Sequence, residues 1–230
     1  MKTKQNFFYP FIFLLVIIFL LINVVKFEYN KELQSSVDAK NCNEINFQKY
    51  DSRVQNLKKL EFNIIIHNNR GWTVNKLRSY TEVRKANWIL PKYKKRFDAT
   101  INIKDSLTLN CNIHAKIRLH GDLFDHLDPL NNSSSLDVKL KNGHIQNNVA
   151  FKLFRPVSRN FENEIFITSI LREIGFLAPR TSFVKVKLED QEFDYIYQER
   201  INKEFLENLN RREGPILEGD ERFEWCLNLG

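Results

Sequence analysis

Cysteine is scarce in this sequence, and its spacing argues against two kinds of site. The 230 residues contain three cysteines, Cys42, Cys111 and Cys226, which lie far apart and form no Cys-x-x-Cys pair. The sequence therefore predicts neither a zinc site nor a thiol redox motif. Cys111 lies on the apolar side of an alternating stretch, so we expect it to be a small, buried and unreactive thiol.

Common catalytic sequence signatures are also missing. There is no Gly-x-Ser-x-Gly elbow, no His-Glu-x-x-His helix and no Walker-type phosphate loop, so hydrolase functions gain no support. Residues 120–128 contain two histidines and three aspartates. Their irregular spacing and the lack of a second cluster favour a polar turn over a metal site, and no metal ligand is predicted.

The excess of positive charge is small. The formal net charge is +7. Lys2, Lys4 and Lys26 lie in a region without acidic residues, which leaves 32 basic and 28 acidic residues after Lys26, a net charge of +4. This excess is too small to predict nucleic-acid binding. The basic run at residues 92–96 is more typical of a solvated loop.

Charge is absent from residues 5–25. Residues 7–25 are almost entirely apolar and have the length of a helix that crosses a bilayer. Residues 1–26 are therefore predicted to be a transmembrane signal anchor. A cleavable signal peptide is less favoured because no small-residue cleavage site follows. Since Lys2 and Lys4 precede the span, we expect a single-pass membrane protein with a cytoplasmic N-terminus and an extracytoplasmic domain.

A folded domain is predicted over residues 57–201, after a polar juxtamembrane tether at residues 27–56. Alternation of apolar and polar residues predicts strands at residues 61–67, 96–103, 107–119, 136–143, 147–154, 182–188 and 193–199. One helix is predicted from about residue 158 to Gly175, and a short one at residues 202–212. This order indicates an α+β fold, with an antiparallel sheet and one packed helix.

A lysine stands within the apolar strand at residues 147–154, and a glutamate lies on the inner side of the next helix. Lys152 alternates with Phe151 and Leu153, and Glu164 extends that helix's apolar stripe by one turn. Protein kinases hold ATP phosphates with a strand lysine and a helix glutamate in this order, and Val-Ala-Phe-Lys fits their Val-Ala-Ile-Lys pattern. The alternative is a surface lysine lying along the sheet and a glutamate that favours the helix dipole.

Three longer segments resemble the CotH spore-coat kinases, a family of atypical secretory protein kinases. They are residues 115–122 (AKIRLHGD), residues 151–188 and residues 195–207 (YIYQERINKEFLE). The shared features are a strand that ends in an Arg-x-x-Gly turn, a helix that closes with Ile-Gly before Ala-Pro-Arg-Thr, and a Glu-Arg-Ile step into a short helix.

The resemblance implies a protein-kinase small lobe that binds ATP together with Mg²⁺ or Mn²⁺. The nucleotide-binding residues that it implies are Lys152 (phosphates), Glu164 (partner of the lysine), Ala150 (adenine side), Gln198 and Glu199 (hinge), and Arg118 and Gly121 (phosphate-covering turn). The family's catalytic base lies in a large lobe, which would begin within residues 202–230. We therefore expect the base to lie outside this chain, which is either a fragment of a longer protein or unable to transfer phosphate by itself.

Two functions remain open at this point. The resemblance implies that the full-length protein phosphorylates serine or threonine of secreted or surface proteins. The alternative is a non-catalytic binding or structural module, tethered at the cell envelope, that keeps the kinase-like fold.

Overall fold

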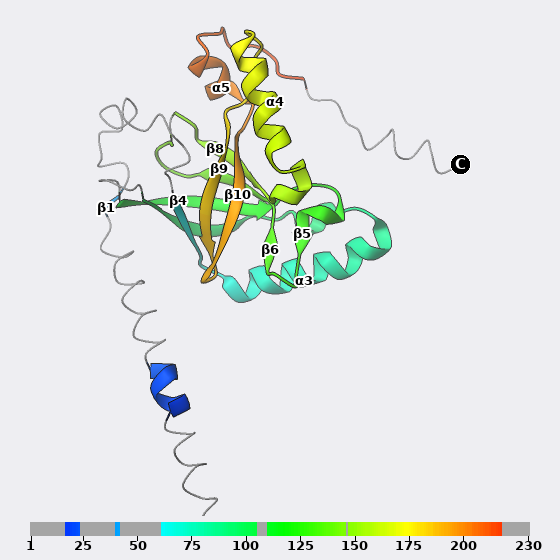
Figure 1. Ribbon diagram of the computed structural model, residues 1–230, viewed down its shortest axis with the longest axis vertical. Coiled ribbons are helices and arrows are strands. Elements are labelled where there is room, and N and C mark those ends of the chain that lie inside the picture. The colour runs from blue at the N-terminus through cyan, green and yellow to red at the C-terminus, as the bar shows by residue number, and fades with distance from the viewer. Residues whose placement is uncertain (1–16, 24–39, 42–60, 105–109, 146, 218–230) are drawn as a thin grey trace, which may run out of the picture.

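The computed structural model describes residues 17–23, 40–41, 61–104, 110–145 and 147–217 (Figure 1). Most strands lie where the alternation predicted them. The longer strands are β2 (Glu61–Ile66), β3 (Phe97–Lys104), β4 (Asn110–Leu119), β7 (Leu136–Leu140), β8 (Ala150–Phe154), β9 (Thr181–Leu188) and β10 (Gln191–Glu199). The short elements are β1 (Lys40–Asn41), β5 (Leu127–Asp128), β6 (Ser133–Ser134), η3 (Pro91–Tyr93), η4 (Phe124–His126) and η5 (Pro156–Arg159), and the helices are α3 (Asn69–Ala86), α4 (Glu162–Glu173) and α5 (Lys203–Asn208).

The seven longer strands form a sheet that closes on itself. Their order is β4-β3-β2-β9-β10-β8-β7, and β7 pairs again with β4. Neighbours are antiparallel except β2 and β9, which are parallel. The predicted fold class, an antiparallel sheet with one packed helix resembling a kinase small lobe, is therefore wrong. Alternation identifies strand residues but not which strands pair. Glu61 pairs with Lys185, for example, although more than half of the sequence separates them.

The inward sides of these strands form one apolar core. Alternate residues of each strand are buried, and at the centre the rings of Phe62, Phe151 and Tyr197 lie 5.0–6.4 Å apart. Full burial of an aromatic side chain of this size contributes about 1.5–3 kcal/mol. Because successive strand residues point to opposite sides, Lys152, between Phe151 and Leu153, points outward.

Helix α3 covers one end of the barrel and was not expected from the sequence. Asn68 caps its N-terminus by accepting a hydrogen bond from the Gly71 N–H at 2.9 Å. The helix inserts Trp72, which packs edge-on against Phe97 at 5.4 Å. Its buried side also contains polar residues, among them Lys76. It therefore lacks the continuous apolar stripe by which an amphipathic helix is found.

Helices α4 and α5 confirm the two predicted helices. α4 follows β8, lies along the outside of the barrel (Figure 1) and ends before Gly175, which has a left-handed φ of +89°. α5 begins after Asn202, whose side chain accepts a hydrogen bond from the Phe205 N–H at 3.1 Å. Of residues 202–230, where a large lobe was expected to begin, residues 218–230 lie outside the described part.

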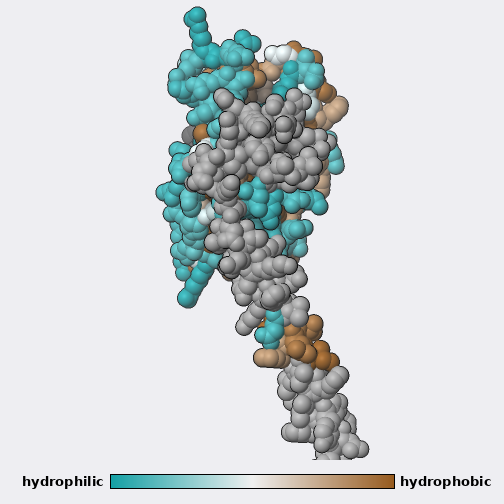
Figure 2. Space-filling view, turned by 90° about the vertical axis from the view of Figure 1, so that its left-hand side faces the viewer, coloured by the Kyte–Doolittle hydropathy of each residue, from teal (hydrophilic) through white to brown (hydrophobic). Residues whose placement is uncertain are grey.

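The predicted single-pass topology is contradicted. Among the described residues, no helix is long and apolar enough to cross a membrane. Of the expected span at residues 7–25, only residues 17–23 are described, as a helical stretch with an almost wholly apolar surface (Figure 2). The membrane-spanning anchor and the orientation derived from it are therefore not retained.

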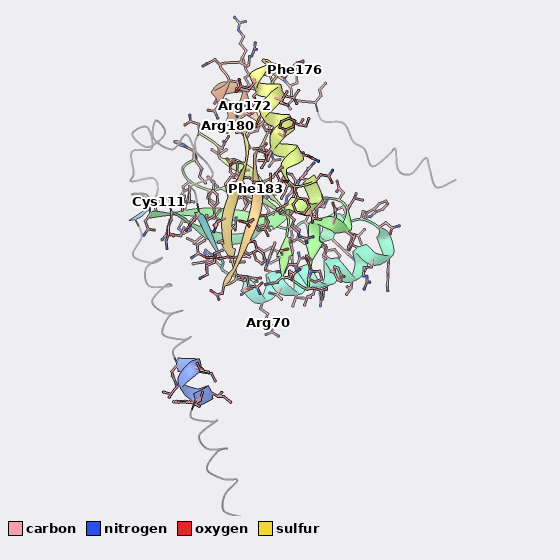
Figure 3. The ribbon with its side chains drawn as sticks, viewed as in Figure 1. Arg70, Cys111, Arg172, Phe176, Arg180 and Phe183 are labelled. Carbon is pink, nitrogen blue, oxygen red and sulfur yellow. The ribbon has the colours of Figure 1, made fainter. Side chains whose placement is uncertain are left out.

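The structure describes little of the expected tether, and it does not contain the expected free thiol at Cys111. Residues 27–56 lie outside the described part except for Lys40–Asn41, which form β1 and pair in parallel with Cys111 and Asn112 of β4. Cys111 is fully buried, as predicted, but it is disulfide-bonded and is not a free thiol (Figure 3). Apolar alternation placed the side chain correctly, but it carries no information about the oxidation state of sulfur.

Candidate functional site

A row of polar side chains crosses the outer face of the barrel over four strands. Arg118 of β4 is the register partner of Asp137 of β7. Asp137 is in turn the register partner of Lys152 of β8, and Lys152 is that of Gln198 of β10. Register partners point to the same face of a sheet. The structure thus brings together three of the sequence-predicted site residues, Arg118, Lys152 and Gln198. We call the four residues the Lys152 row.

Asp137 is the centre of an arginine cluster. Its carboxylate is 2.6 Å from Arg118 Nη2, 3.2 Å from Arg96 Nη2 and 3.8 Å from Arg200 Nη1, and its side chain is 2% exposed. Burial opposes ionisation of the carboxyl, but the positive charges of Arg118 and Arg96 outweigh it and hold the Asp137 pKa below its ordinary value. One buried carboxylate therefore serves three guanidinium groups, which leaves an excess of positive charge.

Lys152 is half-buried beside an aromatic ring. Its Nζ lies 5.9 Å from the centre of the Phe154 ring, and the Arg159 guanidinium lies 4.0 Å from the same ring. The Arg159 Nε is buried and has no hydrogen-bond partner within the described part of the chain. A buried N–H donor without a partner is uncommon, since leaving it unpaired costs free energy. Ala150, the predicted adenine-side residue, is buried two positions before Lys152.

Glu164 lies on α4 and faces this row. Its Oε1 accepts a hydrogen bond from Nε2 of Gln198 at 2.5 Å. Because Gln198 is the register partner of Lys152, Glu164 and Lys152 lie on the same side of the barrel. Glu164 also lies in the first turn of α4, where a negative charge favours the helix dipole.

Two of the predicted site residues lie elsewhere. Glu199 points to the opposite side of β10 from Gln198, and its carboxylate binds Arg180 at 3.1 Å and Asn208 of α5 at 3.4 Å. Gly121 lies in the turn after β4 with a φ of +94°, where an added Cβ would come within 2.0 Å of the His126 ring. Glu199 therefore stabilises the chain before α5, and Gly121 allows the turn to pack against a histidine.

His120 also lies beside the row, although it was not among the nucleotide-binding residues expected from the sequence. Its ring packs edge-on against Phe154 at 5.1 Å. Burial, and then the positive charge of Lys152, lower the His120 pKa to about 2, so the ring is neutral. Neither His120 nor Arg159 stands in a recognisable motif. His120 follows β4 and Arg159 ends η5, and both side chains pack on the Phe154 ring.

Two of the three aspartates of the loop at residues 120–128 form ion pairs, whereas the buried Oδ1 of Asp125 has no hydrogen-bond partner among the described residues. Asp128 pairs with Arg155 at 2.8 Å, and Asp122 pairs with Lys94. His126 shares a hydrogen bond of 2.9 Å with Ser135. In the described part of the chain, no group of three or more histidine, cysteine, aspartate or glutamate side chains could hold a metal ion.

No protein-family model matches this chain, and no curated protein matches it either. The resemblance to the CotH kinases therefore stays a prediction.

Proposed function

We propose that this domain binds ATP through its phosphates at the Lys152 row, as the nucleotide-binding part of a CotH-like protein kinase. The observation that carries the proposal is the hydrogen bond between Gln198 and Glu164, since it places an acidic helix residue beside the strand lysine. Kinases hold ATP phosphates with such a pair. Mg²⁺ or Mn²⁺ would accompany the nucleotide, and serine or threonine of a protein substrate would accept the phosphoryl group.

The charges around the row suit an anion. The basic side chains are Arg96, Arg118, Lys152, Arg159 and Arg200, and the acidic ones are Asp137 and Glu164. The surplus of basic groups favours a polyanionic ligand, and arginine binds phosphate oxygens in a bidentate manner. The unpartnered Arg159 Nε–H supplies a donor that a phosphate oxygen could satisfy.

The test is the thermal stabilisation of the full chain by Mg-ATP, compared with Lys152→Ala and Glu164→Gln. A ligand at about 100 times its Kd adds roughly 2.7 kcal/mol to the free energy of unfolding. We expect the Tm rise to disappear in Lys152→Ala and to be smaller in Glu164→Gln. Lys185→Ala is the matched control, because Lys185 is an exposed strand lysine outside the row.

Two results would overturn the proposal. One is a wild-type protein that Mg-ATP does not stabilise, and the other is an equal stabilisation of wild type and Lys152→Ala. Either result would favour the alternative, a non-catalytic module that acts through its surface.

A further inference from the structure

The positive charge of this chain is concentrated in α3 and the segment that follows it. Residues 69–96 contain nine lysines and arginines and one acidic residue, Glu82. This segment therefore has a net charge of +8. Since the whole chain has +7, all the remaining residues together have −1. Helix α3, which begins the segment, lies at the end of the barrel opposite α5 (Figure 1).

Most basic residues of α3 itself lack acidic partners. Arg70, Arg78, Arg84 and Lys85 are exposed, and none of them forms an ion pair with another described residue. Lys76 is the exception, since it is buried and pairs with the β9–β10 turn. Arg70 points away from the barrel at the N-terminal end of the helix (Figure 3). These charges are available to an anionic partner.

Apolar side chains stand among these charges on the outer side of α3. Val74 is 40% exposed and Leu77 is 50% exposed. They lie at helical spacing from Arg70 and Arg78, so they share one face. The core-facing side of the helix is a different one, since it carries the fully buried Trp72. The outer face of α3 thus combines basic and apolar residues.

The C-terminal end of this face is extended by a second loop. The Ile89 N–H donates to the Asp122 carbonyl at 2.6 Å, which brings the 88–90 segment beside the 122–124 loop. Trp88 is 46% exposed, Leu123 50% and Phe124 56%. Three large apolar side chains therefore project into solvent next to the basic helix. We call the outer face of α3 together with these three residues the α3 surface.

We infer that the α3 surface binds the face of a lipid bilayer that carries anionic headgroups. At the surface of such a bilayer, apolar side chains turn toward the acyl chains and basic ones stay at the headgroups. Tryptophan is enriched at the same depth. Each lysine or arginine near such a surface strengthens binding about fivefold. This contact lies on the bilayer surface and involves no spanning helix.

The apolar residues favour lipid over nucleic acid as the partner. A nucleic acid would use the arginines through its phosphates. It would leave exposed aliphatic residues such as Val74 and Leu77 without a contact. A bilayer interface provides anionic headgroups for the basic side chains and acyl chains for the apolar ones, side by side. The inference is independent of the proposed ATP site, because none of its residues belongs to the Lys152 row.

The test is co-sedimentation of the full chain with vesicles of phosphatidylcholine alone or of equimolar phosphatidylcholine and phosphatidylglycerol. We expect Arg84→Glu/Lys85→Glu to weaken binding to the anionic vesicles by roughly 25-fold or more. The matched control is Lys116→Glu/Lys185→Glu, which makes the same change in charge at exposed strand positions and should bind like wild type. Every variant keeps the apolar residues 7–25, so any contribution of that segment is common to all.

A second measurement reports the depth of Trp88. Vesicles with bromine-labelled acyl chains should quench the wild-type tryptophan emission, and the quenched part should be absent in Trp88→Phe. Equal sedimentation of wild type and Arg84→Glu/Lys85→Glu with anionic vesicles would overturn the inference, as would unquenched Trp88. So would a wild-type protein that ignores anionic vesicles but binds a single-stranded oligonucleotide through Arg84 and Lys85, since the partner would then be nucleic acid.

Discussion

Gln198 of β10 donates a hydrogen bond from Nε2 to Oε1 of Glu164 on α4 at 2.5 Å. This contact ties the helix to the outer face of the barrel at the strand position beside Lys152. It is also the contact by which an acidic residue reaches the Lys152 row. Its direction, with the amide as donor and the carboxylate as acceptor, can be tested by exchange of the two residues.

Gln198→Glu should lower the free energy of unfolding by about 2 kcal/mol at neutral pH, because it sets two carboxylates against each other in a half-buried place. The exchanged pair Gln198→Glu/Glu164→Gln restores one donor and one acceptor. We expect it to recover most of the loss in urea denaturation. A double variant no more stable than Gln198→Glu would show that the two side chains do not interact.

Gly121→Ala should be strongly destabilising. A Cβ at this position meets the His126 ring at 2.0 Å and also imposes an L side chain on a φ of +94°. The crowding and the backbone strain together should cost about 2–5 kcal/mol in the free energy of unfolding. Gly175→Ala is the matched control, with a φ of +89° but nothing within 4 Å of the added Cβ. It should cost about 1 kcal/mol, from the backbone alone, and equal losses at both positions would contradict the predicted clash.

Lys76→Met should lower the free energy of unfolding by about 3 kcal/mol. Lys76 and Glu189 form an ion pair of 3.1 Å with side chains 4% and 9% exposed. The substitution leaves Glu189 as a buried charge that retains the Asn132 amide at 2.9 Å and the Thr73 hydroxyl at 3.5 Å but no cation. Lys203→Met is the control, since Lys203 is 53% exposed and pairs with exposed glutamates. Chemical denaturation should show little change there, because the pairs are exposed to solvent, and an equally small change at Lys76 would mean that its charge is solvated.

Stability should decrease as the pH falls below about 6.5. Burial lowers the pKa of His120 to about 2 and that of His126 to about 4. In the unfolded chain both histidines take up a proton near the ordinary histidine pKa of 6.5. The unfolded state therefore binds more protons than the folded state in this range. Each histidine then lowers the free energy of unfolding by about 1.4 kcal/mol per pH unit.

His120→Gln should reduce this dependence by about half between roughly pH 6 and pH 4.5. Denaturation curves measured across that range provide the slope. His114→Gln, at an exposed position on β4, is the matched control. An unaltered slope in His120→Gln would show that His120 is protonated in the folded protein.

Part of the candidate site could be read from the sequence. Alternation correctly set Lys152 on the face opposite Phe151 and Leu153. Glu164 does face the sheet, but the apolar stripe from which its position was inferred is not buried, since Ile167 is 53% and Ile174 62% exposed. Both patterns are local, since each depends on the geometry of a single element. Glu199 was grouped with Gln198 by sequence, but adjacent strand residues point to opposite faces. His120 and Arg159 lie outside the strands and α-helices, where no periodic residue pattern predicts the course of the chain.

The sequence by itself determined where the strands run, where α4 ends, and which side of each strand enters the core. These features follow from the repeat of two residues in a strand and 3.6 in a helix, which any single segment displays. Only the tertiary structure decided that β2 lies parallel to β9, that β7 pairs back to β4, and that α3 covers one end of the barrel. Those choices depend on how well distant surfaces fit together, and a strand's own alternation is the same whichever neighbour it pairs with.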